Sequence, residues 1–103
     1  MKIVNCKLLA EFRGPGCCEA CRKPCVRLFP HHIFTRGAGQ VDIRENLISL
    51  CLECHAGFHS MGSPSFTRLL KIAADREKST PNRIRAMVFK IRRDQSEKVR
   101  VIQ

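Results

Sequence analysis

Residues 46–59, which read NLISLCLECHAGFH, concentrate two cysteines and two histidines in one short stretch. Asn46 opens an apolar run of strand length, and a CxxC unit and an HxxxH unit follow. The length of residues 52–60 suits a short helix. Residues four apart lie on one face of a helix, so His55 and His59 can offer ring nitrogens to the same metal ion.

A second CxxC unit lies upstream, at Cys18 and Cys21, and matches the unit at Cys51 and Cys54. The spacing lets both sulfurs of each unit reach one tetrahedral ion, so the two units together make a closed four-thiolate site. Zinc is the predicted ion, because it has no redox chemistry and accepts four thiolates. We expect a structural role for it, since so small a domain gains from a metal staple.

Other cysteines leave alternatives open. Cys17 or Cys25 could replace one partner in the first unit, with three intervening residues in place of two. We instead expect Cys6, Cys17 and Cys25 to be spare thiols that behave like small apolar side chains. A thioredoxin-like redox pair is a further alternative. Such a pair needs one CxxC that opens a helix after a strand, whereas this chain has two separated units.

The remaining two histidines, His31 and His32, are adjacent. Successive side chains of a strand point to opposite sides, so one of the pair can bind metal while the other faces elsewhere. Three histidines with open coordination positions are what a catalytic metal requires. A mixed structural site, in which His55 or His59 joins the cysteines, is the competing interpretation.

The composition limits the class of protein. A chain of 103 residues predicts a single domain, residues 1–103, with a modest core. The odd count of seven cysteines and the lack of a leader pattern argue against a secreted disulfide framework, so we expect a cytoplasmic protein. No apolar run is long enough to span a bilayer, and no membrane partner is expected.

Element boundaries follow from short signals. Asn5 can cap a helix that carries Leu8, Leu9 and Phe12, and Gly14 can end it. Residues 16–25 look too punctuated for regular structure. Strands are expected at 26–29 and 46–50, with a loop over 35–45 between them, and Gly62 can end the histidine-bearing helix.

Two amphipathic helices are expected after residue 62. Ser63-Pro64 and Thr80-Pro81 have the form of an N-cap followed by a first-turn proline. The apolar residues recur with helical spacing. They are Phe66, Leu69, Leu70 and Ala73 in the first helix, and Ile84, Met87, Val88 and Ile91 in the second. Residues 63–103 are read as a basic helical extension.

The metal-binding units and the residues between them form one ordered pattern within residues 18–59. Its members are Cys18-x2-Cys21, His31-His32-Ile33, Arg36-Gly37, Asp42, Asn46-Leu47, Cys51-x2-Cys54-His55 and His59. This order resembles the motif of the HNH nucleases, in the subset stapled by a four-cysteine zinc site. The resemblance implies an α+β fold: a small ββα-metal core over residues 18–59, with flanking N- and C-terminal helices.

The resemblance also implies roles. His32 is the expected general base, and Asn46 is expected to bridge the loop and brace the backbone of His32. His31, His55 and His59 are the expected ligands of one catalytic divalent ion. Some family members have Asp where His31 stands, so the all-histidine set favours Mn²⁺, Ni²⁺ or Zn²⁺ beside Mg²⁺.

The implied activity is metal-dependent hydrolysis of DNA phosphodiester bonds. The net charge of +10 agrees with a polyanionic partner, and residues 60–103 hold 11 basic and 4 acidic side chains. Arg36 and Arg44 are candidate phosphate clamps, with solvated loop charges as the alternative. Backbone contacts are blind to sequence, so nicking or double-strand cutting with low specificity is expected, by a monomer or a homodimer. The alternative is a zinc-ribbon nucleic-acid-binding module without chemistry.

Overall fold

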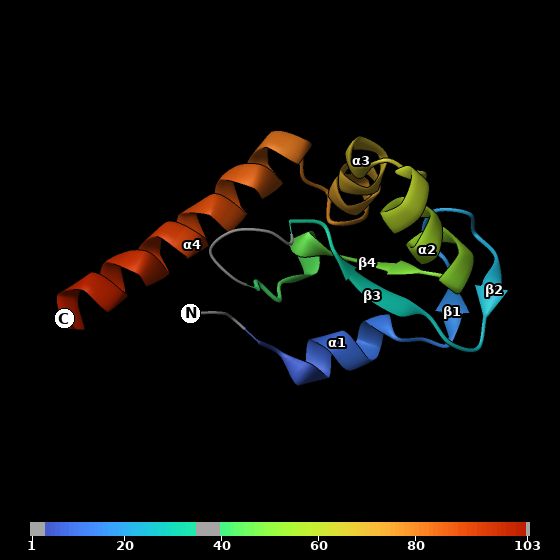
Figure 1. Cartoon of the computed structure of the whole chain (residues 1–103), viewed down its shortest axis with the longest axis horizontal. Coiled ribbons are helices and arrows are strands. Elements are labelled where there is room, and N and C mark those ends of the chain that lie inside the picture. The colour runs from blue at the N-terminus through green and yellow to red at the C-terminus, as the bar shows by residue number, and fades with distance from the viewer. Residues whose placement is uncertain (1–3, 35–39, 103) are drawn as a thin grey trace.

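The computed structural model describes residues 4–34 and 40–102, and it describes side chains as far as Asp94. The described chain is α+β, with four α-helices, one single-turn 3-10 helix and two small antiparallel sheets (Figure 1). The elements are α1 (Cys6–Phe12), β1 (Gly16–Cys17), β2 (Pro24–Cys25), β3 (Phe29–His32), η1 (Arg44–Asn46), β4 (Leu47–Leu50), α2 (Leu52–Met61), α3 (Phe66–Arg76) and α4 (Pro81–Ile102).

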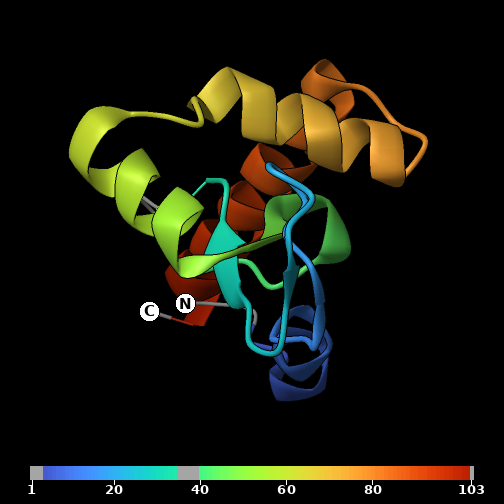
Figure 2. The same ribbon diagram turned by 90° about the vertical axis from the view of Figure 1, so that its right-hand side faces the viewer.

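The centre of the fold is the antiparallel pair β3–β4, in which His31 lies opposite Ile48 and His32 lies opposite Leu47. Helices α2 and α3 contact one side of this pair and α1 covers the other (Figures 1 and 2). Helix α4 contacts α3 and η1 and then runs away from the body of the domain. The hairpin therefore has a helix layer on each side, and α2 follows it directly in sequence.

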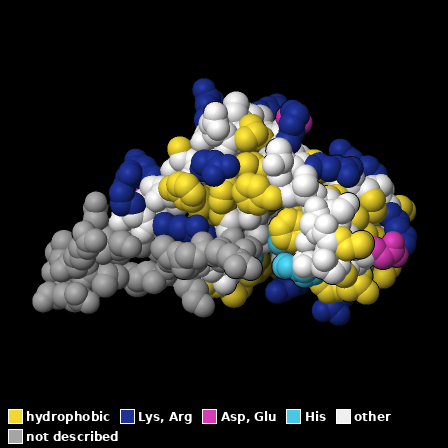
Figure 3. Space-filling view, turned by 45° about the horizontal axis from the view of Figure 1, so that its top comes forward, with side chains coloured by type: hydrophobic (Ala, Val, Ile, Leu, Met, Phe, Trp, Pro, Cys, Tyr) yellow, Lys and Arg dark blue, Asp and Glu magenta, His cyan; other side chains and the backbone are white. Residues whose placement is uncertain are grey.

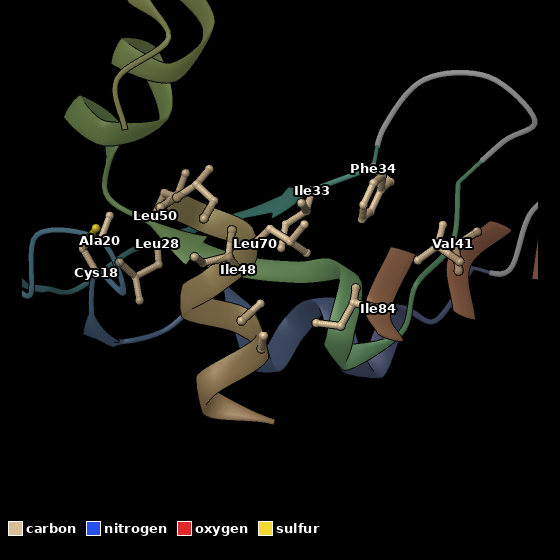
Figure 4. Packing of buried hydrophobic residues seen from close by; sticks show 14 of the residues in the cluster. Cys18, Ala20, Leu28, Ile33, Phe34, Val41, Ile48, Leu50, Leu70 and Ile84 are labelled. Carbon is tan, nitrogen blue, oxygen red and sulfur yellow. The ribbon is translucent and has the colours of Figure 1, made fainter. Parts of the chain in front are cut away.

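The core forms where β4 meets the two C-terminal helices (Figure 4). Ile48, Leu69, Ile84 and Val88 are fully buried there. The predicted amphipathic helices are thus confirmed, with one exception in the apolar stripe of the second. Met87 is 38% exposed and does not belong to the core. The face of α4 that contacts the core is narrower than the stripe of apolar residues in its sequence.

Helix ends follow their local signals at four places. The side chain of Asn5 accepts a hydrogen bond from the backbone N–H of Leu8, and Gly14 after α1 has φ +87°. Gly62 ends α2 in the left-handed region, at φ +66°. Thr80 Oγ1 accepts from the N–H of Arg83 in the first turn of α4.

The cap predicted at Ser63 is wrong. Ser65 caps α3 instead, with its side chain accepting from Arg68 N–H. The segment before it folds back on α2, where Ser63 N–H donates to the carbonyl of Gly57. A Cβ on Gly57 would lie 2.5 Å from the Ser63 carbonyl oxygen. Because Gly57 has no side chain, the chain at Ser63 can pack closely against it. As a result, α3 begins two residues later than predicted.

Two strand predictions also need correction. Residues 16–25 are not irregular throughout, because β1 and β2 pair with Gly16 opposite Cys25. A two-residue ladder has too little alternation to be seen in sequence. The strand expected at 26–29 lies at Phe29–His32, and Val26 is 92% exposed. Pairing with β4, rather than the local apolar run, decides where this strand begins.

Among the described residues, no helix is both long and apolar enough to cross a membrane.

Candidate metal centres

Four thiols converge at one end of the hairpin. Cys18 and Cys21 lie in the turn between β1 and β2, Cys51 is the N-cap residue of α2, and Cys54 lies in its first turn. Their sulfurs all lie within 4.8 Å of one another. Cys21 Sγ and Cys51 Sγ are 3.8 Å apart, and sulfurs held tetrahedrally at about 2.3 Å from one zinc ion are separated by about 3.8 Å. The cluster can therefore hold a zinc ion.

The electrostatics of this cluster also suit a cation. Burial would raise the pKa of the Cys18 thiol, but N–H groups of Cys21, Cys51 and Ala20 lower it to about 7. Burial raises the pKa of Cys54, and the three neighbouring sulfurs raise it further. A divalent ion removes this mutual repulsion and allows several thiolates to coexist.

The three other cysteines lie outside the cluster. Cys6 and Cys17 are exposed, and Cys25 is half-buried in β2. Cys18 and Cys21, rather than Cys17 or Cys25, are therefore the residues that complete a group of four sulfurs with Cys51 and Cys54.

A second group forms where β3 meets α2. The rings of His31 from β3 and of His55 and His59 from α2 have nitrogens within 4.8 Å of one another. The Nε2 atoms of His55 and His59 are 3.3 Å apart. Two nitrogens about 2.0–2.1 Å from one ion at a tetrahedral angle lie about 3.3–3.4 Å apart. The two histidine nitrogens therefore have the separation of ligands that share an ion.

Aromatic contacts hold these rings in place. Phe29 stacks on His55 with an interplanar angle of 2° and a centroid distance of 5.7 Å, and Phe58 meets the edge of His31 at 4.6 Å. His31 is only 3% exposed, and its Nε2 is buried without a hydrogen-bond partner among the described residues. A hydrogen bond between His55 and His59 would leave that atom unsatisfied, whereas one ion can satisfy all three rings.

Burial favours the neutral form of His31 and His55. It lowers the pKa of His31 to about 4, with the neighbouring charges of His55, His59 and His32 acting in the same direction. Burial and the charge of His59 also lower the pKa of His55. Neutral imidazoles carry the lone pairs that a metal ion needs.

His32 lies apart from the three-histidine group and binds a carboxylate. Its Nε2 is 2.6 Å from Asp42 Oδ1, and Asp42 is 2% exposed. Burial opposes ionisation of Asp42, but hydrogen bonds from His32, the N–H of Asn5 and Gln40 lower its pKa overall. Asp42 belongs to the motif, but the sequence alone predicts no role for it. A carboxylate ten residues from a histidine carries no local signal of this contact.

Asn46 is fully buried and joins the two ends of the loop between the strands. Its Oδ1 accepts from Phe34 N–H at 2.8 Å, and its Nδ2 donates to the Val41 carbonyl at 2.9 Å. The expected bridge across the loop is present. The expected brace on the His32 backbone is not, since the side chain bonds to Phe34 and Val41 and only the Asn46 carbonyl reaches Ile33 N–H.

Of the two candidate phosphate clamps, the structure describes only Arg44. Arg36 lies outside the described residues. Arg44 pairs with Glu77 at 3.3 Å and with Glu11 at 3.4 Å, and its guanidinium lies over the ring of Phe12. These contacts link Arg44 to α1 and to the C-cap residue of α3, and its side chain is still 48% exposed. A phosphate contact by Arg44 stays a prediction.

Comparisons with protein-family models, with curated proteins and with solved structures gave no significant match.

Proposed function

We propose that the chain is a metal-dependent DNA endonuclease of the HNH type, which hydrolyses phosphodiester bonds. The observation that carries the proposal is the convergence of His31, His55 and His59, with one buried nitrogen that has no partner among the described residues. We further interpret β3, β4 and α2 as the ββα-metal unit of that family, because a histidine-bearing hairpin is followed directly by the histidine-bearing helix.

In this proposal the three imidazoles hold one exchangeable divalent ion, and the four thiols hold a structural zinc. An ion held by the three imidazoles would supply positive charge beside the scissile phosphate, where negative charge grows in the transition state. Nitrogen ligands favour Mn²⁺, Ni²⁺ or Zn²⁺ beside Mg²⁺. The zinc site fixes Cys51 and Cys54 at the start of α2, and thereby the face that presents His55.

His32 is the proposed general base. Asp42 is a carboxylate in neutral solution, so it accepts a hydrogen bond from His32 Nε2–H and favours the tautomer in which Nδ1 carries no hydrogen. Nδ1 can then take a proton from the water that attacks phosphorus, as the bond to the 3′ oxygen breaks. Asp42 acts as a positioning residue, since it sets the tautomer and orientation of the imidazole.

The basic surface supports DNA as the substrate. Exposed arginines and lysines of α4, at positions 83, 85, 90 and 93, add to a net charge of +10. Helix α4 extends beyond the domain body (Figure 1), which suits contact along a phosphate backbone. Such contacts predict affinity that falls steeply with salt.

Supercoiled plasmid tests the activity directly. Wild type is incubated with plasmid and each of Mg²⁺, Mn²⁺, Ni²⁺ and Zn²⁺, beside His32→Ala, His55→Ala and the control Leu52→Ala, an exposed residue of α2. We expect cutting by wild type and the control, and loss of cutting in both histidine variants. His32→Ala should keep both metals and its DNA affinity, whereas His55→Ala loses the exchangeable ion. Equal cutting by wild type and His32→Ala would contradict the assigned base.

The competing zinc-ribbon module differs in two readouts. It would bind DNA but leave plasmid intact with every ion, and it would hold a single, tightly bound zinc. A chelator wash followed by metal analysis separates the two, because only the nuclease carries an ion that the wash removes.

A further inference from the structure

An open cavity of about 580 Å³ adjoins the histidine cluster. His59 belongs to its lining, together with the aromatic rings of Phe34, Phe66 and Phe89 and the side chains of Arg85 and Arg92. None of the described lining residues is acidic. The cavity thus combines an apolar, aromatic wall with positive charge beside the proposed metal centre.

Arg92 is anchored at this wall by a hydrogen bond, and Arg85 is exposed beside it. Arg92 Nη2 donates to the Phe34 carbonyl at 2.8 Å, while its Nε is buried without a partner among the described residues. The Arg85 guanidinium lies 5.6 Å from the ring centroid of Phe34. A buried guanidinium donor without an acceptor is costly unless an anion meets it.

One ring of the aromatic wall, that of Phe89, is exposed to solvent. Phe34 is buried and meets Phe66 and Phe89 edge-on, at centroid distances of 5.2 and 5.8 Å. Phe89 itself is 48% exposed. Figure 3 shows hydrophobic side chains bordered by Lys and Arg on the face where histidine reaches the surface. An exposed ring flanked by cations offers a stacking platform for a planar, anionic ligand.

We propose that this cavity receives one unpaired nucleotide of the DNA strand being cut, its base stacked on Phe89 and its phosphates on Arg85 and Arg92. The inference rests on the proposed nuclease function and names its substrate class: DNA with unstacked bases near the cleaved bond, such as single strands, bulges and loops. Paired bases bury both faces in the duplex stack, so a regular duplex cannot offer its base to the ring.

The chain contains no Trp and no Tyr, so Phe89→Trp creates a single fluorescent reporter in the cavity. Met87→Trp is the matched control, since Met87 is 38% exposed on the same helix and is not among the lining residues. Both variants are titrated, in chelator, with a single-stranded oligonucleotide and with a duplex of equal length. We expect the single strand to quench Phe89→Trp, the duplex to leave it unchanged, and Met87→Trp to respond to neither.

Affinity provides the second readout. Phe89→Ala should weaken single-strand binding about 10-fold, as loss of one stacked base does, while Met87→Ala and duplex binding stay unchanged. Equal quenching by duplex, or equal losses in both alanine variants, would overturn the proposal. So would a wild-type dimer that Phe89→Ala dissociates without DNA, because a second copy would then cover the ring.

These outcomes separate the two proposals. Binding measured in chelator does not depend on catalysis. A preference for single strands without cutting under any ion would therefore support the nucleotide-binding cavity and contradict the proposed nuclease function. Plasmid cutting without a single-strand preference would do the reverse.

Discussion

His31 and His32 are consecutive residues of β3, yet their rings have entirely different partners. The ring of His31 packs against Phe58 and the two histidines of α2, whereas His32 Nε2 contacts Asp42. Strand alternation produces this separation. It allows one imidazole to serve as a metal ligand while its neighbour stays free of the ion.

The contact between His32 and Asp42 predicts a loss of activity in Asp42→Asn. The Asn amide can donate to Nε2, which moves the ring proton to Nδ1 and removes the base. We expect cutting to slow by roughly 100-fold, the usual scale for a general base, with metal content unchanged. Gln40→Ala is the control, because it removes another hydrogen bond to Asp42 but leaves His32 in place. Nitrogen chemical shifts of the His32 ring report the tautomer. Wild-type rates in Asp42→Asn would refute the role.

The four-thiol cluster predicts that Cys54→Ser and Cys17→Ser behave differently. Cys54 belongs to the cluster and Cys17 does not. Cys54→Ser should lose the tight zinc and most of its cooperative melting, because structural zinc supplies folding free energy in small domains. Cys17→Ser should hold one zinc and melt with wild type. Metal analysis and circular dichroism measure both, and loss of zinc from Cys17→Ser instead would mean that the ligand set is wrong.

Arg76 predicts a large effect on stability. Its guanidinium binds Glu19 at 2.7 Å and the Leu47 carbonyl at 2.9 Å, and its side chain is only 21% exposed. Because most of this ion pair is shielded from solvent, Arg76→Ala should cost about 3 kcal/mol. Lys71→Ala, which breaks the exposed pair with Asp75, should cost under about 0.5 kcal/mol. Urea unfolding measures both, and equal effects would argue against the network.

The buried neutral state of His31 predicts a pH dependence. Its pKa is lowered from 6.5 to about 4, so the unfolded state binds its proton more readily between these values. Stability without the exchangeable ion therefore falls as pH drops below about 6.5, by about 1 kcal/mol between pH 7 and pH 5.5 from this group. His31→Gln should lack this component. The free energy of unfolding is measured with urea at each pH for both proteins. An equal dependence of this free energy on pH in wild type and His31→Gln would contradict the prediction.

Local signals in the sequence are sufficient for several helix ends and for the pairs within each cluster. The helix ends at Asn5, Gly62 and Thr80 depend on a single side chain or backbone angle, and the ligand pairs depend on i, i+3 and i, i+4 spacing. The joining of two distant CxxC units, and of His31 with the histidines of α2, follows from the order of the motif as a whole.

Long-range contacts account for what the sequence does not predict. Asp42 meets His32 across a loop, Glu77 at the end of α3 pairs with Arg44, and the return of Ser63 onto Gly57 moves the cap to Ser65. In each case, the deciding partner is specified only after the chain has folded. The register of β3 depends in the same way on β4.

The central claim is that three imidazoles bind one labile cation while four thiols hold another. Cobalt-loaded protein measured by X-ray absorption, before and after a chelator wash, tests it most directly. We predict two ions per chain, with the washable one bound through nitrogen and lost in His31→Ala, and the retained one bound by four sulfurs. A single ion with sulfur ligands alone, unchanged in His31→Ala, would contradict the account.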